Sequence, residues 1–154
     1  MQLFADLELL NNYCTSTLAC IDPLQFGLLK RVYDHRLSNY KSQAAFAALD
    51  RRNLWEGREV MFNRWSPDHR DQQDPHWAWA CIVYFGNFTN ARFRFPELGL
   101  EIRLQPGDVV FFRGRDLLHG VPEWESGDRH FVVTFTHEAM WKEADVECAS
   151  SKDL

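Results

Sequence analysis

The stretch ARFRFPELGLEIRLQPGDVVFF, residues 91–112, decides the fold class of this chain. Residues 92–95 alternate strictly between arginine and phenylalanine, which is typical of a strand with one buried face. Residues 101–104 alternate in the same way, and residues 109–112 form a continuous apolar run. Proline and glycine between these segments predict tight turns. Short strands separated by such turns predict an antiparallel sandwich or barrel.

The chain on either side of this stretch adds more strands and a helical beginning. Strand-like apolar runs recur at Val60–Trp65, Trp79–Phe85 and Phe131–Thr136. Residues 1–50 favour helix, and Asp22-Pro23 is a helix start, with aspartate as N-cap and proline in the first position. We therefore expect a mainly β fold of the α+β class, with the N-terminal helices packed on the sheet.

Composition indicates one globular domain without a strongly basic surface. The 154 residues are 45% hydrophobic, and the net charge of -5 argues against tight, non-specific binding to duplex nucleic acid. Residues 51–129 contain arginine but no lysine, balanced by acidic residues. Arginine suits bidentate contacts to carboxylate or phosphate, and ordinary surface ion pairing is the alternative.

The cysteines and the hydropathy pattern indicate an intracellular protein. Cys14, Cys20, Cys81 and Cys148 lack C-x-x-C spacing, which predicts free thiols in a reducing compartment. No apolar run is long enough to span a membrane, and the N-terminus lacks a signal-peptide pattern. We expect a nuclear or cytoplasmic location and no membrane partner, and the sequence leaves the oligomeric state open.

Asp68-His69-Arg70-Asp71 carries the first candidate metal ligands. Residues two apart on an extended segment point to the same face, so His69 and Asp71 project together. His119 follows fifty residues later, after the turn Pro106-Gly107-Asp108 and a buried strand that we expect to hold it in place. Two histidines and one carboxylate suit Fe(II) with open coordination positions, although zinc is common in histidine-rich sites.

Arg129 lies ten residues after His119, at the start of the strand Phe131–Thr136. Its planar guanidinium matches a carboxylate with two hydrogen bonds. A buried dicarboxylate such as 2-oxoglutarate needs that partner, because an unpaired buried charge is costly. A surface ion pair with Asp128 or Glu123 is the alternative.

The order in which these motifs follow one another along the chain resembles that of the Fe(II)/2-oxoglutarate dioxygenases. The motifs are H-x-D, a long β segment, P-G-D with apolar residues, a distal histidine, and an arginine ten residues on; the resemblance covers roughly residues 60–141. The nearest likeness is to fungal oxygenase-like domains and the TET/JBP group, on the segments His69–Asp71, Phe93–Gly99 and Arg115–Val121. The chain is much shorter than those enzymes and lacks their Cys-rich zinc elements.

The resemblance implies a fold, a mechanism and a division of the chain. The fold is a double-stranded β-helix, or jelly roll, over residues 58–141, with a helical scaffold at 1–55 and a tail at 147–154, all in one domain. His69, Asp71 and His119 would bind Fe(II), and Arg129 would anchor the co-substrate 2-oxoglutarate, which is consumed with O₂. TET/JBP members oxidise the methyl group of 5-methylcytosine or thymine, so a modified base in nucleic acid is the expected substrate.

Further residues are candidates for contacts with the co-substrate and the substrate. Asn63 and Tyr84 could hydrogen-bond 2-oxoglutarate; a turn cap and a buried core tyrosine are the alternatives. Arg70 could pair with a substrate phosphate or with a neighbouring acid. His76 and Trp77 could form a platform for base stacking, or the tryptophan could simply cover the sheet.

Other functions are compatible with the same sequence. The dioxygenase could act on a protein side chain or a small molecule. The chain could also be a non-catalytic jelly-roll module of the same fold, although the intact triad and Arg129 count against that. A cupin-like metalloenzyme or sugar-binding jelly roll usually carries His-x-His and would not need Arg129.

Overall fold

The computed structural model of this chain describes residues 2–146, with side chains from residue 7 onward. These residues form two compact units: Gly57–His137 make up one, and the residues before and after this segment make up the other. The predicted tail at 147–154, including Cys148, lies outside the described residues. The expected packing of the helices on the sheet stays a prediction.

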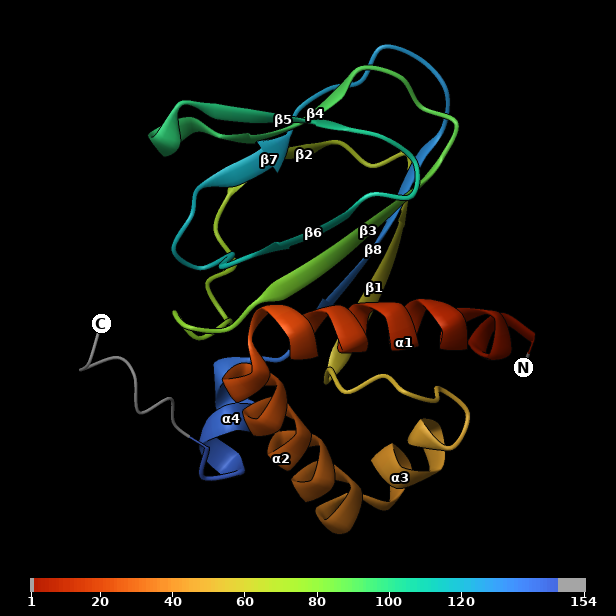
Figure 1. The fold of residues 1–154 in the computed structure, drawn as a ribbon, viewed down its shortest axis with the longest axis vertical. Helices are drawn as coiled ribbons and strands as arrows, with labels where there is room; N and C mark the ends of the chain where they lie inside the picture. The colour runs from red at the N-terminus through yellow and green to blue at the C-terminus, as the bar shows by residue number, and fades with distance from the viewer. Residues whose placement is uncertain (1, 147–154) are drawn as a thin grey trace. The chain divides into compact units, whose positions relative to one another are not determined.

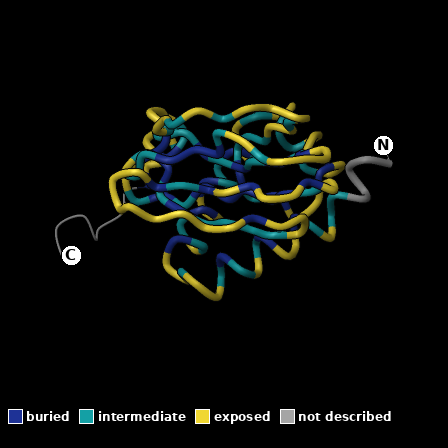
Figure 2. The backbone as a smooth tube through the Cα atoms, turned by 90° about the horizontal axis from the view of Figure 1, so that it is seen from above, coloured by how far each residue is buried: buried dark blue, intermediate teal, exposed yellow. Residues whose placement is uncertain are grey.

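One unit is helical, as the sequence predicts. Its helices are α1 (Gln2–Ile21), α2 (Pro23–Asn39), α3 (Lys41–Ala47) and α4 (Glu138–Glu143). The Asp22 side chain accepts a hydrogen bond from the Gln25 backbone N–H at 2.9 Å and caps α2. Buried and exposed residues alternate along the helical turns (Figure 2), so α2 presents one face to an interior. No helix among residues 2–146 is long and apolar enough to cross a membrane.

The other unit is a sandwich of two antiparallel sheets, seen as two facing layers in Figure 1. One sheet has the strand order β1 (Gly57–Phe62), β8 (Arg129–Phe135), β3 (Ala80–Gly86), β6 (Val109–Phe112). The other has the order β2 (Ser66–His69), β7 (His119–Val121), β4 (Ala91–Phe95), β5 (Leu100–Leu104). This arrangement is the double-stranded β-helix, which confirms the predicted fold class.

The alternating stretch forms the β4–β5 hairpin. Ala91, Phe93 and Phe95 are buried, whereas the arginines between them face outward. Phe93 packs edge-on against Phe112 of the opposite sheet, with ring centres 5.1 Å apart. The core of the sandwich is therefore built by aromatic side chains from both layers.

Two strands are not predicted by the sequence pattern, and both carry candidate metal ligands. Strand β2 has the sequence SPDH and β7 has HGV, and neither contains enough apolar alternation to be recognised. Each is ordered by pairing with the other. The buried strand 109–112 was expected to hold His119 in place, but His119 begins a strand of its own, because residues 113–118 first turn the chain into the other sheet.

Candidate active site

Three candidate metal ligands meet at the paired strands β2 and β7. His69, the last residue of β2, lies directly opposite His119, the first residue of β7. Asp71 follows β2 in an irregular segment, and its backbone N–H donates to the Gly114 carbonyl at 3.0 Å. The Asp71 carboxylate lies 3.6 Å from His69 Nε2 and 3.9 Å from His119 Nε2. One donor atom from each residue falls within 4.8 Å of the others.

Both imidazoles are oriented by the backbone two residues earlier. His69 Nδ1 lies 2.8 Å from the Pro67 carbonyl oxygen, and His119 Nδ1 lies 2.8 Å from the Leu117 carbonyl oxygen. A carbonyl can only accept, so each Nδ1 carries the proton and each Nε2 keeps a lone pair for a metal. Burial also lowers the pKa of His119, which favours the neutral, ligating form.

These donors fit a divalent iron ion. Two neutral imidazole nitrogens and a carboxylate form the set found in non-haem Fe(II) oxygenases, with coordination positions left for other ligands. The arrangement of these three donors at the β2–β7 pair is therefore consistent with the metal that the sequence predicts.

Arg129 is a fully buried cation, with 0% of its surface exposed. It opens β8, in the sheet opposite the histidines. One terminal nitrogen donates to the Arg64 carbonyl, but Nε has no hydrogen-bond partner among the described residues. Aromatic rings surround the guanidinium, with that of Trp124 4.9 Å and that of Phe131 5.0 Å from its central carbon. Burial lowers the pKa of Arg129, and the nearby Tyr84 phenol acts in the opposite direction. No carboxylate among the described residues pairs with this guanidinium.

A cavity of about 430 Å³ within the sandwich contains both groups. His69, Asp71 and His119 line it from one sheet, and Arg129 with Tyr84 lines it from the other. An orphaned buried guanidinium in the same cavity as a metal-ligand triad fits a bound dicarboxylate that bridges the two.

Comparison with known proteins agrees with this geometry. Residues 1–138 match the family model for the Tet_JBP oxygenase domain of the 2OGFeDO superfamily. The chain belongs to the TET/JBP oxygenase family. It is 30% identical to Tet-like dioxygenase 1 of Naegleria gruberi over 135 residues, which is 84% of this chain and 39% of that protein. Among solved structures it resembles NgTET1 in complex with 5mC DNA, with a TM-score of 0.67 and 25% identity over 86% of this chain. The chain spans about half of that structure, 49%.

Tyr84 and Asn63 contact Arg129 in different ways in this TET/JBP domain. Tyr84 is buried, and its ring centre lies 5.8 Å from the guanidinium carbon. Burial raises its pKa, so the phenol keeps its proton. The Asn63 side chain accepts from the Arg129 N–H at 2.8 Å and donates to Asp128 at 2.7 Å. Asn63 does not line the cavity, so its position supports holding the Arg129 backbone, and direct co-substrate contact stays a prediction.

The three predicted substrate residues lie outside the cavity lining. Arg70 pairs with Glu97 at 2.5 Å, and His76 Nδ1 lies 2.5 Å from an Asp116 carboxylate oxygen. Trp77 is half-buried. For Arg70 the structure therefore gives the alternative of a neighbouring acid, and contacts of all three with substrate stay predictions.

Polar residues that the sequence reasoning missed do line the cavity: Gln72, Gln73 and His137. The glutamines directly follow the H-x-D motif, so their position next to the candidate ligands could have identified them as cavity residues. On β8 every second residue from Arg129 onward lines the cavity, and His137 lies two residues after the last of them. The i, i+2 rule would have placed it on that face.

Ion pairs link the strands that carry the candidate metal ligands to the β4–β5 hairpin of this TET/JBP domain. Arg94 on β4 binds both carboxylate oxygens of Asp68, at 2.7 and 2.8 Å. Glu97, in the turn between β4 and β5, pairs with Arg70 and also accepts the Leu118 N–H at 3.2 Å. The Leu118 N–H and the Arg70 charge lower the pKa of Glu97. Each candidate ligand therefore has a sequence neighbour, Asp68, Arg70 or Leu118, that is bonded to this one hairpin.

Proposed function

We propose that this chain is an Fe(II)- and 2-oxoglutarate-dependent dioxygenase that oxidises the methyl group of a modified, 5-methylcytosine-like base in nucleic acid. The observation that carries the proposal is Arg129, a buried guanidinium in the cavity of the His-Asp-His triad that no acidic side chain in the described part of the chain pairs with. The family match and a relative solved with 5mC DNA support the same chemistry.

Each residue of the site has a distinct task in this proposal. His69, Asp71 and His119 hold Fe(II), and Arg129 binds the distal carboxylate of 2-oxoglutarate. When bound, iron, 2-oxoglutarate and O₂ supply an oxidant that breaks a C–H bond, while the co-substrate becomes succinate and CO₂. The protonated Tyr84 phenol offers a hydrogen-bond donor beside Arg129. Apolar side chains make up much of the remaining cavity lining.

The cavity also supports the proposed substrate class. Gln72, Gln73 and His137 provide hydrogen-bond donors and acceptors beside apolar walls, which is what recognition of a heteroaromatic ring requires. A base in a duplex must leave the stack to reach such a cavity. A single strand presents its bases without the unpairing cost that extraction from a duplex carries, so single strands should be the better substrates.

An anaerobic titration tests the co-substrate site. We expect Fe(II) and 2-oxoglutarate together to produce a visible metal-to-ligand charge-transfer band. Arg129→Ala should weaken the apparent 2-oxoglutarate affinity by about 100-fold, because a buried carboxylate loses its charged partner. Arg31→Ala, at an exposed position on α2, is the matched control. Wild-type protein without a band would contradict the proposal.

A turnover assay tests the substrate. Succinate formation should increase with 5-methylcytosine oligonucleotides and not with unmodified ones, with single strands more effective than duplexes. Equal turnover with and without the methylated oligonucleotide, despite a normal charge-transfer band, would keep the dioxygenase chemistry and reject the nucleic-acid substrate.

A further inference from the structure

Strand β5 is an exposed edge that carries apolar side chains. Among the described residues it pairs only with β4. Leu100 and Ile102 lie opposite Phe95 and Phe93, so they belong to the core-facing side of the sheet. They are nevertheless 45% and 39% exposed. Edge strands are usually protected by proline, by lysine or other charged side chains, or by a bulge. Strand β5 has no proline, lysine or bulge, and its only charged side chains are Glu101 and Arg103.

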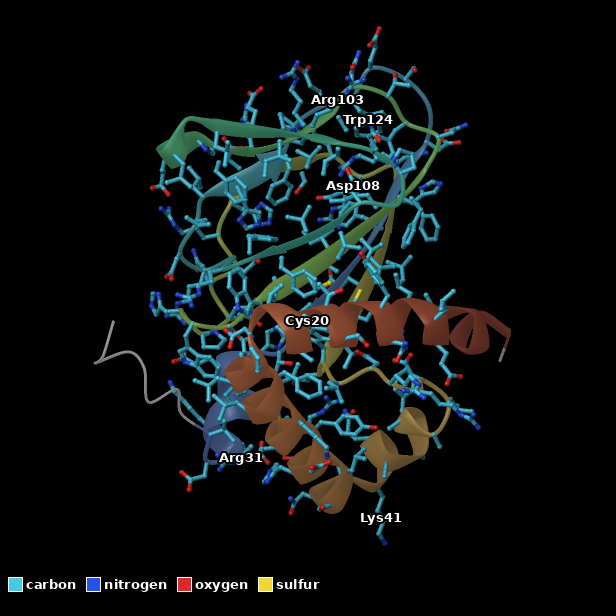
Figure 3. The ribbon with its side chains drawn as sticks, viewed as in Figure 1. Cys20, Arg31, Lys41, Arg103, Asp108 and Trp124 are labelled. Atoms are coloured by element: carbon cyan, nitrogen blue, oxygen red, sulfur yellow. The ribbon has the colours of Figure 1, made fainter. Side chains whose placement is uncertain are left out.

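The outward face of β5 has an unbalanced charge. Arg103 lies directly opposite Arg92 of β4, and like charges at such positions repel. Glu101 pairs with Arg92, with nitrogen and oxygen 3.3 Å apart. Arg103 is exposed on the outer side of this layer (Figure 3), and no described acidic side chain pairs with it.

The sequence of β5 is complementary to itself. If two copies pair antiparallel about a two-fold axis at Ile102, Glu101 of each copy lies opposite Arg103 of the other. The same register puts Leu100 opposite Leu104, so the core-facing rows meet on one side and the charges on the other. We propose that β5 pairs with β5 of a second copy of this chain, forming a continuous sheet across a symmetric dimer.

The other sheet edges lack this combination. Strands β1 and β2 border the cavity, through residues that include Met61 and His69. Strand β6 has the sequence VVFF and no charged residue that could fix a register. An extended segment of another protein could also add to β5, but the alternation of Glu101 and Arg103 specifies a copy of itself.

Charge reversal on β5 tests the dimer by sedimentation equilibrium from micromolar to millimolar protein. We expect wild-type chain to dimerise and Arg103→Glu to raise the dimer dissociation constant at least about tenfold, because two attractive pairs become repulsive. Within one copy the new glutamate faces Arg92, so this variant should fold at least as well as wild type. Arg31→Glu makes the same charge change on α2 and should leave the dimer intact.

Two further combinations identify the register. Glu101→Arg alone should raise the dimer dissociation constant in the same way, whereas the double variant Glu101→Arg with Arg103→Glu should recover the dimer. A mixture of the two single variants should form a heterodimer, because every β5 charge then meets its opposite. The charge-transfer band should persist in Arg103→Glu, since β5 does not line the cavity.

Three results would overturn the proposal. The first is a monomeric wild-type chain throughout the concentration range, which is also expected if β5 accepts another protein. The second is a dimer that Arg103→Glu leaves unchanged, which would place the contact elsewhere. The third is failure of both the double variant and the mixture to dimerise while circular dichroism shows them folded.

Discussion

At the scale of single residues, the site depends on side chains whose surroundings allow only one arrangement. Gly114 is an example. Its carbonyl accepts the Asp71 N–H, and a Cβ built on it would lie 1.9 Å from the Asp71 carboxylate oxygen. No side chain fits there without moving the carboxylate. The metal geometry therefore depends on a residue that offers no ligand atom.

We expect Gly114→Ala to weaken Fe(II) affinity by about 100-fold, because an ångström-scale displacement of Asp71 spoils the triad. Isothermal titration with Fe(II) under anaerobic conditions measures this. Gly27→Ala, where a Cβ meets nothing within 4 Å, is the matched control and should bind normally. Equal affinities for the two variants would show that Asp71 tolerates the displacement.

Arg129 should lower the stability of the unliganded protein while it provides the binding contact for 2-oxoglutarate. Its charge is buried, and no acidic side chain among residues 7–146 pairs with it. Arg129→Met should therefore raise the free energy of unfolding of the unliganded protein by about 1 kcal/mol. Urea unfolding without ligands measures the change, and a destabilised variant would contradict it. Added 2-oxoglutarate with Fe(II) should stabilise the wild type and leave the variant almost unaffected.

Residue types and spacing were enough to nominate the triad and Arg129, which the structure brings into one cavity. They also nominated Asn63, but not its contact with the Arg129 backbone, which depends on a φ of 48° at Asn63. Such a role arises because two segments that are distant in the sequence lie side by side in the fold. A local sequence pattern carries no information about that contact.

At the scale of elements, the hairpin of β4 and β5 contacts the segments that carry the candidate metal ligands. Strands β2 and β7 are four and three residues long, too short to be stable by themselves. Their ion pairs and hydrogen bonds to the hairpin hold these two short strands in place. The same shortness explains why the sequence did not predict them: their order comes from neighbours, whereas β4, β5 and β6 carry their own apolar pattern.

We expect Glu97→Gln to weaken Fe(II) binding severalfold at pH 7, because the link between Arg70 and the Leu118 backbone loses its charge. It should also change acid stability. Since the folded pKa of Glu97 lies below its ordinary value of 4.5, its contribution to stability is present above that value and is lost as the pH falls through the lower folded pKa.

Urea unfolding from pH 7 to pH 3 checks this dependence. The stability difference between wild type and Glu97→Gln should shrink as the pH falls below about 4.5. Glu123→Gln, at an exposed position, should parallel wild type throughout. A difference that stays constant across this range would show that the Glu97 charge is not involved.

At the scale of the whole molecule, the site spans the sandwich. The histidines come from one sheet and Arg129 from the other, so a metal-bound dicarboxylate would connect the two layers. The sequence predicted the helical beginning and the β-rich unit from composition and periodicity. The assignment of strands to opposite sheets follows from topology, and local patterns could not supply it.

Metal and co-substrate should therefore stabilise the protein cooperatively. In anaerobic calorimetry, the rise in unfolding temperature with Fe(II) and 2-oxoglutarate together should exceed the sum of the separate rises. At 100 times the dissociation constant, a ligand adds about 2.7 kcal/mol to the stability. The excess should vanish in Arg129→Ala, and a purely additive shift in wild type would contradict a bridging ligand.

The direct pairing of His69 with His119 has a consequence for how the protein acquires its structure. The register of β2 and β7 shifts between Ser66 and His69, and the two imidazoles become neighbours only after that irregularity. If β2 slipped by a single residue, its side chains would exchange faces and the two rings would separate. Under the proposed function, a molecule with slipped strands could not retain iron. Iron retention would then distinguish correctly assembled chains from misassembled ones, and iron supplied during refolding would select the former.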